Sequence, residues 1–181
     1  MALSMPPTVS ALGNKVVVFL TTPPAAGTGI PTTVEVSAAL FASLHLYTPF
    51  NVTPSQNTGE GPRKLGQRQV PTELGLTSYP AVEITYSYDP QALGTPGGDG
   101  NELYEALVPG DQVTVVVLDG LDGEETDSVT AGDIADIYLM ECGVRRKGQT
   151  GDDEYAKFNV SQSLIVVGGQ PIAEDHALAA A

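Results

Sequence analysis

Two segments of this chain alternate apolar and polar residues with a period of two, and this alternation restricts the fold more than any other feature. In the first segment the apolar positions are Val82, Ile84, Tyr86 and Tyr88. In the second they are Phe158, Val160, Leu164 and Val166. Successive side chains of a β-strand point to opposite faces, so each segment predicts a strand with one buried face. We expect these faces, together with Val115 and Ile137, to be buried between two sheets.

Other segments add strands and only one clear helix. The apolar runs at residues 16–20 and 112–118 and the pattern at 133–140 predict further strands. Residues 102–108 predict a short helix that begins after Asp99 or Asn101, while residues 33–40 suit either a strand or a short helix. The order lacks a βαβ rhythm. The sequence therefore predicts a mainly β fold: a two-sheet β-sandwich or partial barrel with one short α-helix.

The length and the apolar content fit one domain. The chain has 181 residues, of which 41% are hydrophobic, enough for a substantial core. We expect residues 1–181 to form one domain with an N-terminal strand and arm at 1–30 and a C-terminal arm at 168–181. Residues 49–80 are polar, rich in proline and without a period, and predict a long loop between strands. Long loops in compact domains usually have a function.

Charge is segregated along the chain. Residues 70–143 contain fifteen carboxylates and no lysine or arginine, within a net charge of −14. Six of the eight basic residues form two clusters on either side of that stretch: Arg63, Lys64 and Arg68, and then Arg145, Arg146 and Lys147. Such an acidic chain is not expected to bind nucleic-acid phosphates or anionic membranes. Segregated patches favour self-assembly, in which a basic patch on one subunit meets an acidic patch on the next.

The sequence holds little that could serve catalysis. His45 and His176 have no cysteine near them in sequence, and Cys142 lies beside apolar residues, as a small core or interface residue does. The acidic segment 119–127 departs from the calcium-loop pattern because Leu121 and Gly123 occupy ligand positions, so a solvated turn is favoured. We therefore expect no enzymatic activity, no metal and no cofactor. No signal peptide or membrane span is expected either, because the apolar run at 16–20 is too short.

The order of segments resembles a known family. It runs from Lys15-Val16-Val17-Val18-Phe19 and Pro31-Thr32-Thr33-Val34-Glu35-Val36 through the long polar loop to the strand at 82–91 and the helix at 101–107. Ala131-Gly132-Asp133, Gly143-Val144-Arg145-Arg146-Lys147 and Lys157-Phe158-Asn159-Val160-Ser161-Gln162 follow. Together these segments resemble the major tail tube proteins of long-tailed bacteriophages, particularly those of actinobacteria.

The resemblance implies a structural virion protein that is assembled in the host cytoplasm. Its subunits would form hexameric rings that stack into the tail tube, with a tape measure and other tail proteins as partners and with DNA in transit. The long loop, the terminal arms and the two basic clusters would then make contacts between subunits. A tail terminator or decoration protein remains an alternative, and a carbohydrate-active β-sandwich enzyme is a more distant one.

A tube also needs an inner wall. In a ring with a continuous barrel, alternate residues of one sheet point inward. The candidates for this wall are the polar positions that alternate with the apolar ones: Glu83, Thr85, Ser87, Asn159, Ser161 and Ser163. Such a wall should lack basic residues and large apolar groups, so that DNA neither binds nor stalls.

Overall fold

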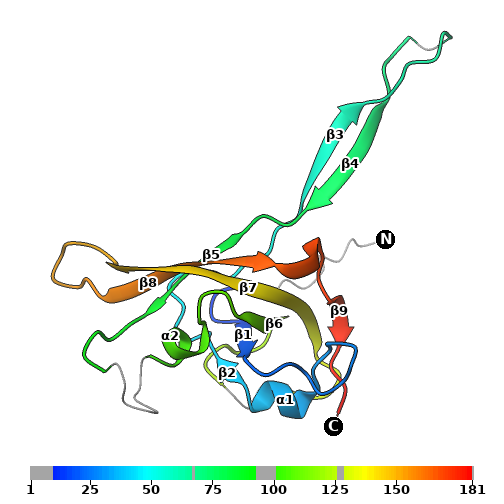
Figure 1. Cartoon of the computed structure of the whole chain (residues 1–181). Helices are drawn as coiled ribbons and strands as arrows, with labels where there is room; N and C mark the ends of the chain where they lie inside the picture. The colour runs from blue at the N-terminus through cyan, green and yellow to red at the C-terminus, as the bar shows by residue number, and fades with distance from the viewer. Residues whose placement is uncertain (1–9, 67, 93–100, 126–128, 181) are drawn as a thin grey trace, which may run out of the picture.

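The computed structural model describes residues 10–66, 68–92, 101–125 and 129–180. The fold is mainly β, with a curled sheet that forms a half-barrel and a small second sheet (Figure 1). The large sheet has the order β2-β1-β6-β7-β8-β5, and β9 also pairs with β7. Its strands are β1 (Lys15–Leu20), β2 (Leu40–Phe41), β5 (Val82–Ser87), β6 (Gln112–Asp119), β7 (Ile134–Gln149), β8 (Phe158–Val166) and β9 (Ala173–Ala177). The predicted fold class is confirmed.

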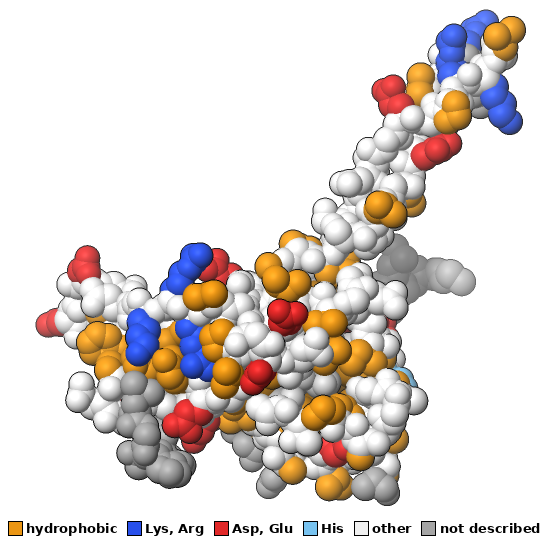
Figure 2. Space-filling view, viewed as in Figure 1, with side chains coloured by type: hydrophobic (Ala, Val, Ile, Leu, Met, Phe, Trp, Pro, Cys, Tyr) orange, Lys and Arg blue, Asp and Glu red, His pale blue; other side chains and the backbone are white. Residues whose placement is uncertain are grey.

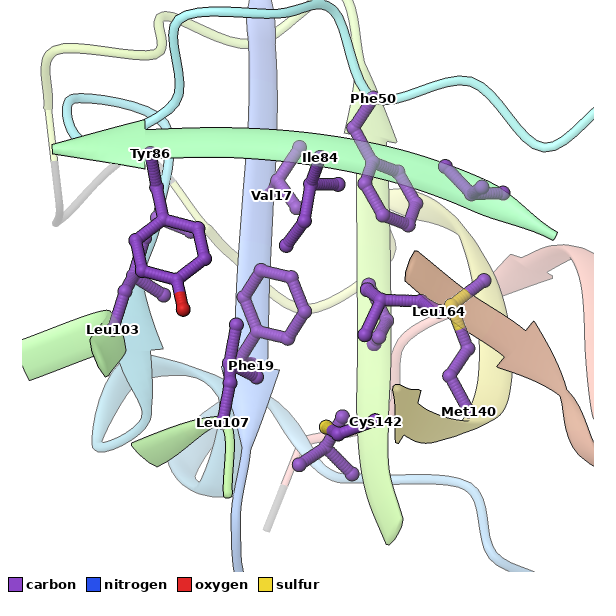
Figure 3. Packing of buried hydrophobic residues seen from close by; sticks show 14 of the residues in the cluster. Val17, Phe19, Phe50, Ile84, Tyr86, Leu103, Leu107, Met140, Cys142 and Leu164 are labelled. Carbon is purple, nitrogen blue, oxygen red and sulfur yellow. The ribbon is translucent and has the colours of Figure 1, made fainter. Parts of the chain in front are cut away.

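The main core fills the inside of the curl. Side chains from β1, β5, β7 and β8 converge there with Phe50 and with two leucines from the helical segment (Figure 3). The predicted strand faces are buried with one exception, but they lie inside the curl of one sheet and not between two sheets as expected. Phe158 is 59% exposed, so its predicted burial was wrong. It lies opposite Gln149 at the far end of the β7–β8 pair, where the ribbon has run beyond the core.

A second apolar cluster lies on the other face of the same sheet. Val16, Val116 and Ile137 pack there against Val36 of helix α1 (Thr33–Ser37) and Leu178 near the C-terminus. Ile137 is therefore buried as predicted, but in a different layer from Val115. Along β1, β6 and the first half of β7 both faces are covered, which explains why residues 16–20 read as a continuous apolar run.

Local contacts define two further segments, residues 33–40, which suited either a strand or a short helix, and the C-terminal residues from 168 onward. Thr32 and Glu35 form a capping box: the Thr32 backbone N–H donates to Glu35 Oε2 at 2.7 Å, and the Glu35 N–H donates to Thr32 Oγ1 at 3.4 Å. This box starts a helix where a strand was equally expected. Beyond a 3₁₀ turn, η2 (Val167–Gly169), residues 173–177 form β9 and pair with β7.

Helix α2 (Glu102–Ala106) forms close to the predicted place, but Asn101 does not cap it through its side chain. Instead Asn101 Nδ2 donates to the Asp89 carbonyl at 2.8 Å, and the Asp89 N–H donates to Asn101 Oδ1 at 3.0 Å. The other candidate cap, Asp99, lies outside the described residues. Asn101 thus links the start of α2 to the segment that follows β5.

Residues 49–80 lie between β2 and β5. Within them the chain forms a hairpin that the sequence did not predict. The strands β3 (Ser55–Glu60) and β4 (Thr72–Ser78) pair with each other and with no other strand, and they project from the body (Figure 1). Every residue of both strands is exposed. Because neither face is buried, the sequence shows no apolar alternation there.

Candidate assembly surfaces

The projecting β3–β4 hairpin is the first candidate surface. Its leucines have no core to enter: Leu74 is 73% exposed and Leu76 is 84% exposed. A two-stranded hairpin alone in water is marginally stable. Exposed leucines on such a hairpin therefore indicate a surface that gains burial from a partner. Leucines inside an otherwise polar segment were the sequence signal for this surface, and the prediction from charge alone missed them.

The first basic cluster lies between the two strands of this hairpin. Arg63, Lys64 and Arg68 are all exposed. Figure 2 shows basic side chains at the outer end of the projection, with acidic ones farther down. The three predicted contact residues are thus brought together at the point farthest from the body. This position permits contact with another molecule.

The second basic cluster lies inside β7 and is divided between its two faces. The register shifts between Cys142, opposite Leu164, and Arg145, opposite Gln162, so Gly143 and Val144 together face one residue of β8. This is a β-bulge, which inserts one extra residue and reverses the alternation after it. Arg145 and Lys147 therefore face the inside of the curl, and Arg146 faces the opposite side. The expected single patch of three basic residues does not exist.

On the inner side, the two basic side chains pack against tyrosine rings. The guanidinium carbon of Arg145 lies 4.2 Å from the centroid of the Tyr104 ring, and Arg145 Nε donates to the Leu107 carbonyl at 3.1 Å. Lys147 Nζ lies 4.7 Å from the centroid of Tyr88 and donates to its hydroxyl at 2.6 Å. These are cation–π contacts, which hold the charge over an aromatic face. The sequence did not predict either contact, although Tyr88 was expected on the buried face of its strand.

A buried polar network fixes the bulge. Gln162 is 1% exposed, and its Nε2 donates to the carbonyls of Leu107 and Gly143 at 3.0 Å and 2.8 Å. The Tyr86 hydroxyl donates to Gln162 Oε1 at 3.0 Å. Burial is the main cause that raises the pKa of Tyr86 to about 12, partly opposed by the nearby Arg145 charge. Tyr86 therefore remains a neutral donor at ordinary pH.

The six candidate wall residues occupy one face of β5 and β8. Glu83, Thr85 and Ser87 lie directly opposite their partners on β8 in the antiparallel register; these partners are Ser163, Ser161 and Asn159. The Thr85 and Ser161 hydroxyls are 3.2 Å apart. Glu83 is exposed, whereas Asn159 is 8% exposed and hence buried in the single subunit. The sequence-predicted set is thus one contiguous surface, with Asn159 at its buried end.

This face differs from the expected wall in one respect. Arg146 lies opposite Ser161 and shares a surface pocket with Glu83, Ser161 and Ser163. Exposed apolar residues, Val144 and Ile165, stand on the same side. The expectation of a face free of basic and large apolar residues was therefore wrong, because the bulge turns Arg146 toward it.

The remaining candidate groups are His45, Cys142 and the acidic turn at 119–127. His45 Nε2 lies 3.3 Å from Glu102 Oε2, and its Nδ1 lies 3.3 Å from Ser87 Oγ. Cys142 is buried, and burial raises its pKa to about 11. Among the described residues, no group of three or more His, Cys, Asp or Glu side chains could hold a metal ion. Residues 126–128 of the acidic turn lie outside the described part.

Within the same described part, no helix has the length and apolar content needed to cross a lipid bilayer. No curated protein matches this chain. A family model described as phage tail tube protein matches residues 4–179, nearly the whole chain. Membership in such a family implies a structural, non-enzymatic component of the virion tail, which assembles with itself and with other tail proteins. The half-barrel with its projecting hairpin thus belongs to a protein of the phage tail tube family.

Proposed function

We propose that this protein forms hexameric rings that stack into the tail tube of a long-tailed, siphophage-type virus and conduct DNA into the host. The observation that carries the proposal is the β3–β4 hairpin, in which every strand residue is exposed and three basic residues cluster at the outer end. Such a projection has a physical use in an assembly, where it reaches a neighbouring subunit. Assembly would take place in the host cytoplasm, with a tape measure protein among the partners.

The hairpin combines two kinds of contact. Arg63, Lys64 and Arg68 complement the acidic surface of a chain whose net charge is −14. Exposed ion pairs contribute only about 0–1 kcal/mol each, so their main effect is on register. Burial of Leu74 or Leu76 would contribute about 1.5–3 kcal/mol for each side chain. In this proposal the leucines supply most of the affinity and the basic residues select the position.

We further propose that the outer face of β5 and β8 lines the channel. Its support is the cross-strand pairing of Glu83, Thr85 and Ser87 with three polar residues of β8. This half of the sheet is the part whose outer face is not packed by the second apolar cluster around α1. Polar side chains at a wall allow DNA to pass without the tight binding that a fully basic wall would produce.

Charge reversal at the end of the hairpin tests the assembly proposal. The triple variant Arg63→Glu, Lys64→Glu and Arg68→Glu is expected to remain folded and to fail to polymerise, because three attractive contacts become repulsive in every subunit. The matched control is Arg63→Lys, Lys64→Arg and Arg68→Lys, which keeps the charge and should form tubes. Negative-stain microscopy reports the tubes, and thermal melting reports the fold. Normal tubes from the glutamate variant would refute the role of the hairpin end, and rings that do not stack would favour a tail terminator.

A further inference from the structure

Arg146 differs in its surroundings from the two basic residues on either side of it. Its neighbours Arg145 and Lys147 are engaged with tyrosine rings on the inner side. The side chain of Arg146 is exposed and makes no hydrogen bond or ion pair with any residue that the structure describes, while its backbone pairs with Ser161 of β8. We infer that Arg146 is a backbone-phosphate contact for double-stranded DNA in the channel, an inference that rests on the proposed channel face.

The pocket at Arg146 has the groups that a phosphate contact requires. Arg146 lies opposite Ser161, and the pocket also includes Ser163 and Glu83. Guanidinium and hydroxyl groups are the common side-chain partners of phosphate oxygens, and such contacts carry no sequence information. None of the pocket residues is aromatic, so the site offers no surface on which a base could stack. These features favour passing phosphates over any particular DNA sequence.

The β-bulge determines which face of the strand Arg146 points to, and Val144 of the bulge lines the same pocket. Gly143 has no side chain, and a Cβ there would lie 2.8 Å from the Ser163 carbonyl oxygen, closer than real Cβ contacts allow. The strand can pack so closely at the bulge because position 143 is glycine. The same bulge turns Arg146 away from the tyrosines. One local irregularity therefore places a single positive charge among hydroxyl groups.

Glu83 keeps such a contact weak. Its carboxylate shares the pocket with Arg146 and would repel the phosphate that the guanidinium attracts. A hexameric ring would then carry six such pairs of Arg146 and Glu83 around the channel, one pair from each subunit. DNA would be centred by many brief contacts that are released quickly. Removal of the arginine and removal of the glutamate should accordingly change the passage of DNA in opposite directions.

The experiment uses phage particles that carry variant tail tubes, with genome release triggered in vitro and followed by a DNA-binding dye. At about 0.01 M ionic strength, Arg146→Gln should release DNA roughly twofold faster or more than wild type, and Glu83→Gln should release it more slowly. At about 1 M both should match wild type, because the screening length falls from about 30 Å to about 3 Å. Arg146→Lys keeps the charge and is the control.

Each other outcome overturns the inference. Equal rates for Arg146→Gln and wild type at low ionic strength would exclude a phosphate contact. Failure of both Arg146→Gln and Arg146→Lys to build tails would assign Arg146 to a protein contact, and a change of rate in the same direction for Glu83→Gln would exclude the opposed pair.

A labelling experiment separates this inference from the proposed channel face. In assembled tubes of Ser161→Cys, a small maleimide should react and a maleimide on a large polymer should not, while the buried Cys142 supplies the unreactive background. Reaction with the large reagent would place the face outside and remove the basis of both proposals. Protection from the large reagent with unchanged release rates would keep the channel face and reject the phosphate contact alone.

Discussion

The half-barrel body and the β3–β4 hairpin are built from strands of the same chain, yet they differ in what stabilises them. In the body, β1, β6 and the first half of β7 have apolar clusters on both faces. In the hairpin, no strand residue is buried and two leucines face solvent. The body has buried contacts on which the fold of one subunit can rest. The hairpin has none, and it would gain apolar contacts only against another subunit.

The largest expected effect is on the body. Leu164 is fully buried, and it lies opposite Val82 and Cys142 on its two neighbouring strands. Leu164→Ala should lower the free energy of unfolding by about 2–5 kcal/mol, because the sheet cannot close the resulting cavity. Chemical denaturation of the single subunit measures this loss. A loss below about 0.5 kcal/mol is typical of surface positions, and it would show that Leu164 contributes no more to stability than an exposed residue of the hairpin.

A smaller effect on the body is expected at alkaline pH. Burial raises the pKa of Tyr86 to about 12 from its ordinary value of 10. Between these values the unfolded chain loses the hydroxyl proton while the folded chain keeps it. The folded state then binds more protons, so the free energy of unfolding falls as pH rises from about 10 to about 12. Burial also raises the pKa of Tyr138 and that of Cys142, and both add to the fall.

Tyr86→Phe isolates the contribution of one hydroxyl to that slope. The variant loses the hydrogen bond to Gln162 at every pH, so the slope between pH 10 and 12 and not the stability itself is the measurement. The slope should become shallower than in the wild type. Tyr155→Phe changes an exposed tyrosine and should leave the slope unaltered. Equal slopes for the Tyr86 variant and the wild type would show that Tyr86 does not carry the alkaline dependence.

The smallest effect on a single subunit is expected in the hairpin. Leu74→Ser and Leu76→Ser should change the unfolding free energy by no more than about 0.5 kcal/mol, because both side chains are exposed. Tube formation should nevertheless require a higher protein concentration, by about tenfold for each 1.4 kcal/mol of lost burial. Light scattering against concentration measures it, with Thr77→Ser as the control in the same strand. Unchanged polymerisation would mean that these leucines stay exposed in the tube.

The same contrast explains which parts of the fold could be predicted from the sequence. The strands at 82–87 and 158–166 have one face in the core, so their alternation is visible in the residues themselves. The hairpin strands bury no face in the subunit and leave no period in the sequence. Phe158 follows the alternation of β8 yet is exposed, because periodicity records the direction of a side chain and not how far the core extends.

The candidate surfaces were predictable in part. Residue types and spacing identified the two basic clusters and a polar strand face, and the structure brings Arg63, Lys64 and Arg68 together. The division of the second cluster could not be foreseen, because a bulge depends on pairing with a distant strand. For the same reason the sequence reading ended this strand near Met140, whereas β7 continues to Gln149.

The bulge at Gly143 and Val144 also has a consequence for changes in chain length. Loss of Val144 would leave Gly143 opposite Ser163, Arg145 opposite Gln162 and Arg146 opposite Ser161, which is an unbroken antiparallel ladder. A one-residue deletion there would straighten β7 and keep every later side chain on its present face. A slip that smoothed the ladder without a deletion would instead exchange the two faces from that point onward. Deletion, usually the harsher mutation in a strand, is at this position the milder one.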